Sequence, residues 1–302
     1  MRRSTALALA AGALAVAKIS QQSLKAHIPG DVPEDHEDNT YGLPNGNPVR
    51  KQLRRYFRDQ LKRLVGFVAK IGTEIPHTFP AMADYDDPIA SAMTPIIGQY
   101  WDKVGKGLRG RLGLDTDEWR VADPNVHKAI KQQCLKFAAS TNATTDLAVG
   151  RAREAVRQKL AAGLIAEAQT IPELTRAIRE VFKTAIKSRA ETIARTETAR
   201  AVHAAAEMSI QQTGLTYTKK WLLSAHSCPV CVNLAAAMPQ AGPGQAFGTI
   251  GKDADYAVIR FPPAHPNCRC SITFVVAGDG SQAGDVPAFV PSASPQSKAE
   301  TA

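Results

Sequence analysis

The chain has few aromatic residues, few cysteines and no long hydrophobic run. Each of these shortages makes some classes of protein function less favoured. Only 6% of its 302 residues are Phe, Trp or Tyr, so nucleic-acid binding by base stacking is not favoured. A 12-residue apolar run near the N-terminus is too short to span a bilayer. No Gly-rich phosphate loop, H-E-x-x-H motif or Ser-His-Asp order is present, which argues against the common nucleotide-binding and hydrolase classes.

The remaining composition is that of a folded protein with a positive charge. Apolar residues make up 44% and charged residues 22%, which predicts one large or two modest domains. The 37 Lys and Arg against 28 Asp and Glu give a formal charge of +9, which permits contact with nucleic acid or an anionic surface. The charge is uneven, since residues 31–38 carry five acids and no base, whereas residues 51–70 carry seven bases and one acid.

Residues 50–70 also show a helical apolar stripe, with the bases on another face. Such a basic amphipathic helix can touch DNA, lipid or an acidic partner, but more often it packs by its apolar stripe and leaves a solvated basic face. Both readings stay open. The candidates for a DNA or anion contact are Arg54, Arg55, Arg58, Lys62 and Arg63.

The N-terminal 20 residues have the outline of a secretory signal, with a basic start and an apolar run from Ala6 to Ala17. The run is mostly alanine, however, the best helix former. We expect a plain N-terminal helix there, followed by a polar connector to residue 49.

The middle of the chain is predicted to be helical. Helices are expected at 50–70, 99–113, from Pro124, at 144–169, from about Pro172 and at 188–212, with the proline-rich stretch 72–98 as a loop. The spacing Thr170 to Glu173, repeated at Ser188 to Glu191, predicts two capping boxes.

The character of the chain changes at Gly214, a predicted helix end. Residues 216–223 and 271–276 alternate as strands do. The stretch from 277 to 302 is rich in Gly, Ser and Pro and is predicted to be a disordered tail. The expected fold class is therefore mainly α with a small C-terminal antiparallel β element, α+β overall.

Four of the five cysteines lie within 43 residues, beside a histidine. Cys228 and Cys231 form a C-x-x-C pair, and His265, Cys268 and Cys270 offer three more ligands. Zinc takes four Cys or His ligands tetrahedrally, so the sets are four sulfurs, or three sulfurs with His265. A structural zinc ion would close the 33-residue connection between the two halves and pin both strands.

Other chemistries remain open for these residues. Two disulfides could staple the same strands, the C-x-x-C could be a redox pair, the thiols could be unliganded, or a Cys–His pair could be nucleophilic. His226 is a sixth, weaker metal candidate, and Cys134 lies on an apolar helical stripe, where a lone cysteine is a small buried hydrophobe.

The helix at 188–212 carries charged residues at helical spacing. Glu191 and Arg195 are four apart, and Glu197 and Arg200 are three apart, so each pair can meet on one helix face. Either the helix is half exposed, or Arg195 and Glu197 are partly buried and orient it against the metal-bound hairpin.

Together these pieces resemble the phage Mu F-like minor head protein family, also called phage head morphogenesis proteins. The matching pieces are IARTE at 193–197, Gly214, Trp221 at the end of a strand, the C-x-x-C, Phe247 and PPAHPNCRC at 262–270. The resemblance covers about residues 124–276, and it makes Arg195, Glu197 and Trp221 parts of a structural motif.

The resemblance implies a non-enzymatic minor capsid protein of the virion. Such a protein would act in procapsid assembly with the portal and with capsid or scaffold proteins, and could contact packaged double-stranded DNA. Assembly in the reducing host cytoplasm favours metal over disulfides. The implied organisation is an N-terminal segment at 1–49, a basic helical region at 50–123, a Mu F-like domain at 124–276 and a tail at 277–302. The rival is a metal- or thiol-dependent hydrolase of nucleic acid or peptide that uses His265 and Cys268.

Overall fold

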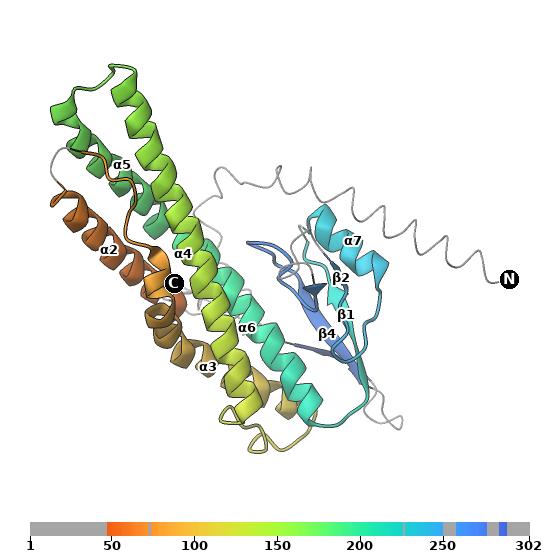
Figure 1. Cartoon of the computed structure of the whole chain (residues 1–302). Coiled ribbons are helices and arrows are strands. Elements are labelled where there is room, and N and C mark those ends of the chain that lie inside the picture. The colour runs from red at the N-terminus through yellow and green to blue at the C-terminus, as the bar shows by residue number, and fades with distance from the viewer. Residues whose placement is uncertain (1–46, 72–73, 226, 250–257, 277–283, 289–302) are drawn as a thin grey trace, which may run out of the picture. The chain divides into compact units, whose positions relative to one another are not determined.

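The computed structural model describes residues 47–71, 74–225, 227–249, 258–276 and 284–288. The signal-like N-terminus and the acidic stretch 31–38 lie outside these residues. The longer helices, labelled in Figure 1, are α2 (Pro48–Val68), α3 (Asp86–Arg111), α4 (Pro124–Ala161), α5 (Thr170–Thr184), α6 (Ala190–Gln212) and α7 (Pro229–Ala237). The strands are β1 (Tyr217–Leu222), β2 (Gly248–Thr249), β3 (Val258–Ile259), β4 (Ser271–Val276) and β5 (Gly284–Pro287).

These elements confirm the predicted class, mainly α with a small antiparallel β element. No helix in the described part of the chain is long and apolar enough to cross a membrane. The chain forms two compact units. We call the described residues of Asn45–Gln99 and Val121–Thr198 the helical unit, and those of Tyr100–Arg120 and of the chain from Ala199 onward the C-terminal unit. The boundaries between the units fall within α3 and α6.

Apolar stripes hold the helical unit together. The Asn47 side chain caps α2 by accepting from the backbone N–H groups of Val49 and Arg50. The buried stripe of α2 faces α5, where the rings of Phe57 and Phe182 meet edge to face, 6.5 Å apart. The apolar stripe predicted at 50–70 is thus confirmed, since its residues Leu53, Phe57, Leu64 and Val68 are buried.

A buried polar cluster lies inside the same unit. The Asn142 side-chain oxygen accepts from Tyr56 and from Gln60 Nε2, the latter at 3.0 Å, and its amide donates to Asp86 at 2.5 Å. These bonds satisfy Asn142, which is 1% exposed, and fix how α2, α3 and α4 pair within the unit.

The prediction of a loop at 72–98 and a short helix after it is wrong over most of its length. α3 begins at Asp86 and runs through Pro95 to Arg111 as one helix. Pro88 suits the first turn, and buried apolar side chains on both sides of Pro95 carry the helix past it. The predicted helix end near Gly113 is confirmed, since Gly113 has a left-handed φ of 68°.

Both predicted capping boxes are wrong. Thr170 is the first residue of α5, and neither its hydroxyl nor the N-cap Gln169 caps the helix. Ser188 lies inside a π-helical turn, η3 (Ala185–Arg189), and its hydroxyl donates to the Thr184 carbonyl at 3.1 Å. Helical structure therefore continues from Thr170 to Gln212, and the two helices predicted after Pro124 are one helix, α4.

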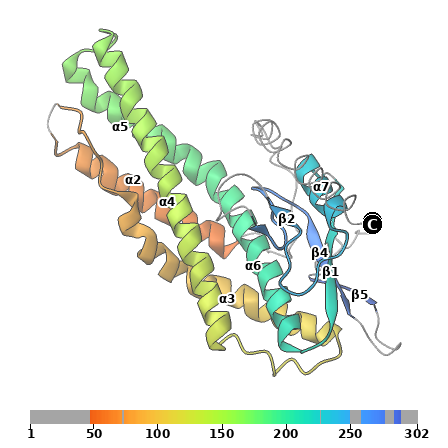
Figure 2. The ribbon, with the colours of Figure 1, turned by 45° about the vertical axis from the view of Figure 1, so that its right-hand side comes forward.

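The C-terminal unit contains the sheet, with strand order β1-β4-β5. β1 and β4 are antiparallel, with Tyr217 opposite Val276 and Trp221 opposite Ile272, which confirms both predicted strands. β5 pairs with the other edge of β4, as Figure 2 shows, so the predicted disordered tail is wrong at Gly284–Pro287. The strand forms because β4 offers it an edge, and Arg111 then donates to the Ala288 carbonyl at 3.0 Å. The rest of the predicted tail lies outside the described residues, apart from Ala288.

A buried ion pair anchors β1 to α6 within this unit. Lys219 Nζ lies 2.6 Å from Glu207 Oε1, and the two side chains are 0% and 7% exposed. The Gly244 N–H also donates to Glu207 at 3.2 Å, and the backbones of Lys219 and Ala241 exchange two hydrogen bonds. One carboxylate thus joins the helix, the strand and the segment that follows α7.

Candidate metal centre

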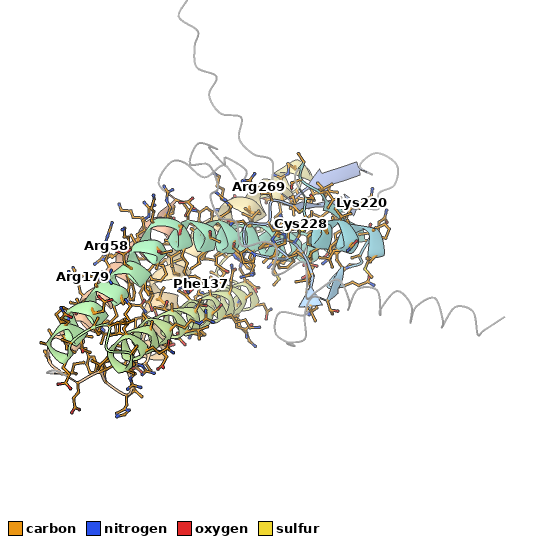
Figure 3. All side chains as sticks on the ribbon, turned by 90° about the horizontal axis from the view of Figure 1, so that it is seen from above. Arg58, Phe137, Arg179, Lys220, Cys228 and Arg269 are labelled. Atoms are coloured by element: carbon orange, nitrogen blue, oxygen red, sulfur yellow. The ribbon has the colours of Figure 1, made fainter. Side chains whose placement is uncertain are left out.

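The first half of the cysteine cluster is built by the start of α7. Cys228 is the N-cap residue and Pro229 occupies the first turn, where its missing N–H costs nothing. Cys231 follows three residues later, so one helical turn brings both sulfurs to the same side. Figure 3 labels Cys228, which is half buried, whereas Cys231 is 1% exposed.

The second half is a tight turn that leads into β4. The Cys268 N–H donates to the His265 carbonyl at 3.2 Å, and Asn267 takes a left-handed φ of 59°, which asparagine tolerates well. Cys270 comes directly before the first residue of β4. The pairing of β1 with β4 then holds this turn beside the start of α7.

The structure brings all five predicted ligands together in what we call the Cys/His knot, Cys228, Cys231, His265, Cys268 and Cys270. Two triads share Cys231: one with Cys228 and His265, the other with Cys268 and Cys270. Within each triad all ligand atoms lie within 4.8 Å of one another. His265 Nε2 is 3.1 Å from Cys228 Sγ and 3.4 Å from Cys231 Sγ.

These separations suit a tetrahedral zinc ion. Zn–S bonds of about 2.3 Å place neighbouring sulfurs about 3.8 Å apart, and Cys231 Sγ lies 3.6 Å from Cys268 Sγ. A disulfide needs about 2.05 Å, and all five cysteines, including the buried Cys134, are free thiols. The spacing of the donors therefore fits zinc, and their number is one more than a tetrahedral ion needs.

The side chain of His265 is oriented as in known zinc sites. Its Nδ1 lies 2.8 Å from the Pro266 carbonyl, which can only accept, so Nδ1 carries the proton and Nε2 faces the sulfurs. Hydrogen bonding to the Cys228 sulfur raises the pKa of His265 to about 10. In the absence of metal Nε2 is thus also protonated, and metal binding would displace that proton.

Hydrogen bonds within the knot favour the thiolate form of Cys228 and Cys270. The neighbouring Cys231 thiol holds the pKa of Cys228 at about 4. Hydrogen bonds from Cys231 and Cys268, and then from Ser227 and the Ser224 N–H, place the pKa of Cys270 well below its usual value. Cys231 is the donor to these neighbours, which raises its own pKa. Thiolates are the form that binds zinc.

Sequence reasoning missed His203, which supports the knot from α6. It is 0% exposed, and its Nε2 lies 3.2 Å from the hydroxyl of Ser271, the residue after Cys270. Burial lowers its pKa to about 4, so the ring is neutral at pH 7. The only sequence signal is a lone imidazole on an alanine-rich helix face.

The predicted structural-motif residues lie outside the two triads. Trp221 is buried on β1 and meets the Phe247 ring at 5.2 Å, which ties the segment after α7 to the sheet. Arg195 is half buried and Glu197 is 7% exposed on α6, and the Glu197 carbonyl accepts from Gln133 at 3.1 Å. Glu191 forms an ion pair of 2.7 Å with Arg50 on α2.

The basic residues predicted on α2 divide into two kinds. Arg54 donates to the Ile186 carbonyl in the π-helical turn at 3.2 Å, and is therefore used within the helical unit. Arg55, Arg58, Lys62 and Arg63 are exposed. His226, the weaker metal candidate, lies outside the described residues.

Comparison with known proteins gives one family. Residues 152–273 match the family described as phage Mu protein F like protein, so this part of the chain is a phage Mu F-like domain, as the motif resemblance indicated. No curated protein gave a significant match, and no solved structure did either. The family suggests a structural phage head morphogenesis protein that associates with the virion and with other head proteins.

Proposed function

We propose that the protein is a minor head component of a tailed phage or prophage that acts in procapsid assembly together with the portal and the capsid or scaffold proteins. The observation that carries this proposal is the Cys/His knot, which joins α7 to the start of β4 within the family match. In this role the protein is structural, resides in the virion and has no catalytic residue.

Zinc is the proposed ion of the knot. Cys228, Cys231 and Cys268 would bind it with either His265 or Cys270 as the fourth ligand, and Cys231 belongs to both triads. The ion would supply bonds that hold the start of α7 to the turn before β4, the two ends of the connection that contains β2 and β3.

The rival role of a hydrolase is less well supported. A catalytic zinc ion keeps one position open for water. Here five donors converge on a centre with four places, and two of the sulfurs, those of Cys231 and Cys268, are 1% and 2% exposed. A centre with a surplus of donors and with buried sulfurs favours structure over turnover.

Head assembly in the parent phage tests the proposal. Cys231→Ser removes the ligand that both triads share, whereas Cys134→Ala removes a buried thiol outside the knot and serves as the control. We expect heads that lack the Cys231→Ser protein and retain the control, measured by mass spectrometry of purified heads. Normal incorporation of Cys231→Ser would contradict the role of the knot, and absence of the wild-type protein from heads would contradict the function itself.

A further inference from the structure

We propose that the acidic stretch 31–38 of this chain binds back onto the helical unit, in the groove between α2 and α5, with Arg179 as its central contact. The inference assigns an occupant to a surface that no motif in the sequence pointed to. It does not depend on the proposed head function, because both the groove and the stretch that fills it belong to this chain.

The groove lies between two helices that run in opposite directions. Phe57 of α2 contacts Phe182 of α5, and further along α2 Val65 lies on the same groove wall as Ile171, near the start of α5. The groove has a volume of about 610 Å³. Its apolar lining comes from both helices, from Val65, Ala69, Ile171 and Pro172.

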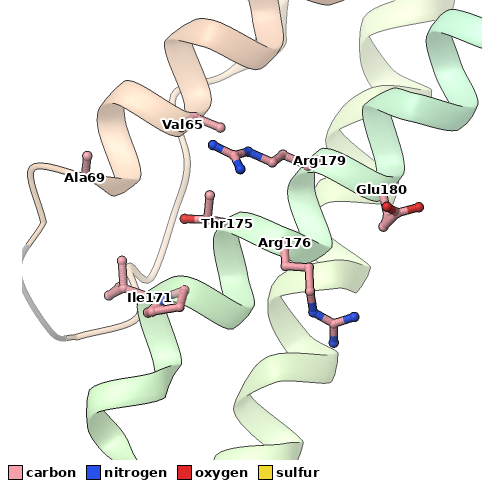
Figure 4. Close-up of a pocket in the computed structure, with 8 residues that line it drawn as sticks. Val65, Ala69, Ile171, Thr175, Arg176, Arg179 and Glu180 are labelled. Carbon is pink, nitrogen blue, oxygen red and sulfur yellow. The ribbon is translucent and has the colours of Figure 1, made fainter.

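The charged side chains that line the groove come from α5 and are Arg176, Arg179 and Glu180. Arg176 is paired with Glu173 at 2.6 Å, and Glu180 with Lys183 at 3.4 Å. In Figure 4 both point away from α2, whereas the Arg179 side chain extends toward it. Arg179 is exposed, and it has no ion pair or hydrogen bond with any residue that the structure describes. A carboxylate that enters the groove would therefore meet an unpaired cation beside apolar surface.

The face of α2 that leads from the start of the helix to the groove is basic. Arg58 and Lys62 are exposed and precede Val65 and Ala69 by seven residues each, so all four lie on one helix face. Within the described part of the chain, neither cation forms an ion pair or hydrogen bond. A segment that approaches from the start of α2 thus passes Arg58 and Lys62 before it reaches the groove.

The acidic stretch has the composition that this path requires. Its sequence, DVPEDHED, carries five carboxylates and no Lys or Arg, and it also contains Val32 and Pro33. The carboxylates can pair with the cations of both helices, and the two apolar side chains can contact the apolar lining of the groove. Exposed ion pairs are individually weak, so several must form together.

The chain is long enough for this contact. Residues 39–46 join the acidic stretch to Asn47, the N-cap of α2. Eight extended residues span about 26–29 Å, and Arg58 lies only about 17 Å from Asn47 along the helix axis. The stretch itself, also eight residues, covers the further distance of about 17 Å from Arg58 to Ala69 when it is extended.

The short connection favours this occupant over an acidic segment of another protein. A short tether gives an effective concentration on the order of mM, so weak contacts suffice for binding within the chain. The bound stretch would neutralise the cations of this surface until a stronger anion displaces it. The contact is therefore an intramolecular cover for the basic face of the helical unit.

Carbodiimide cross-linking of the full-length protein, followed by peptide mass spectrometry, tests the proposal, because the reagent joins a carboxylate to a lysine amine in contact with it. The measured quantity is the yield of cross-links from residues 31–38 to Lys62 at 50 mM NaCl. Arg179→Glu removes the central cation, and Lys131→Glu makes the same charge change at an exposed site on α4. We expect Arg179→Glu, and 500 mM NaCl, each to lower the yield about fivefold or more, and the control to change it less than about twofold.

Three results would overturn the proposal. If Arg179→Glu leaves the yield at the level of the control, the stretch does not occupy the groove. If Lys62 and Lys131 of the wild type are cross-linked to the stretch equally, it has no preferred site. A mixture of unlabelled and ¹⁵N-labelled chains separates the remaining case, since cross-links between differently labelled peptides would assign the stretch to a second copy of the chain.

Discussion

Each of the two units is stabilised internally by a different kind of interaction. In the helical unit, long helices bury continuous apolar stripes, and the buried Asn142 finds its partners on neighbouring helices of that unit. In the C-terminal unit, the strands of the sheet have six residues or fewer. A buried ion pair and a cluster of five Cys and His side chains that could hold a metal join the segments around them. Apolar packing tolerates small changes, whereas a charge pair or a metal site fails when one member is lost.

Metal removal should produce the largest difference in stability between the two units. Structural zinc contributes about 10 kcal/mol or more in small isolated modules, so chelation should expose the amides of β1 and β4 to hydrogen exchange. The amides of α2 and α5 should keep their protection, because no Cys/His knot ligand lies on those helices. Hydrogen exchange with and without a chelator measures this protection. Equal loss of protection in both units would contradict the prediction that the metal stabilises only the C-terminal unit.

The buried ion pair should show the next largest effect. Glu207→Gln leaves the Lys219 ammonium buried without a counter-charge, which should lower the free energy of unfolding by about 3–5 kcal/mol. The double variant Glu207→Leu/Lys219→Met should recover most of that loss, because no charge remains buried. Urea unfolding measures both.

The control for this pair is the exposed ion pair of Lys106 with Asp102, in which Lys106→Met should cost less than about 1 kcal/mol. If Glu207→Leu/Lys219→Met is as unstable as Glu207→Gln, the loss of stability comes from changed side-chain packing and not from the unpaired charge.

His203 should make the C-terminal unit sensitive to acid. Its pKa is about 4 in the folded protein, because burial disfavours the imidazolium, against about 6.5 for an unperturbed histidine. The unfolded chain therefore binds the proton first, and stability is full above pH 6.5 and falls as the pH drops toward 4, by about 3 kcal/mol.

The difference between wild type and His203→Gln isolates this contribution. The free energy of unfolding of the variant, measured from pH 7 to pH 4, should fall less steeply than that of the wild type. Parallel curves would show that His203 does not titrate in this range.

The cap of α2 should have the smallest effect. Asn47→Ala removes the acceptor for two backbone N–H groups and should cost about 1 kcal/mol in thermal unfolding. Asn125→Ala, an exposed first-turn position of α4 whose N–H is capped by Asp123, should cost less. Equal costs would mean that helix propensity, not capping, governs these positions.

The sequence predicted the parts of the structure that local patterns encode. The apolar stripe of α2, the start of α4 at Pro124, the pair β1 and β4, and the convergence of the cysteines all followed from local sequence patterns. The long-range contacts could not be predicted from local patterns. α3 continues through Pro95 because buried neighbours stabilise it, and Ser188 fails as a cap because α5 and α6 join through a π-helical turn.

The same limit applies to the site. The sequence indicated the five candidate ligands that the structure brings together, but nothing in it placed His203 beside Ser271 or paired Glu207 with Lys219. Those contacts depend on how α6, β1 and β4 pack, which no local spacing encodes.

Native mass spectrometry of the purified protein tests the central claim, that a metal ion organises the Cys/His knot. We predict one zinc ion per chain in the wild type and in Cys134→Ala, and none in Cys231→Ser. A wild-type chain without metal, or a Cys231→Ser chain that keeps it, would contradict the claim.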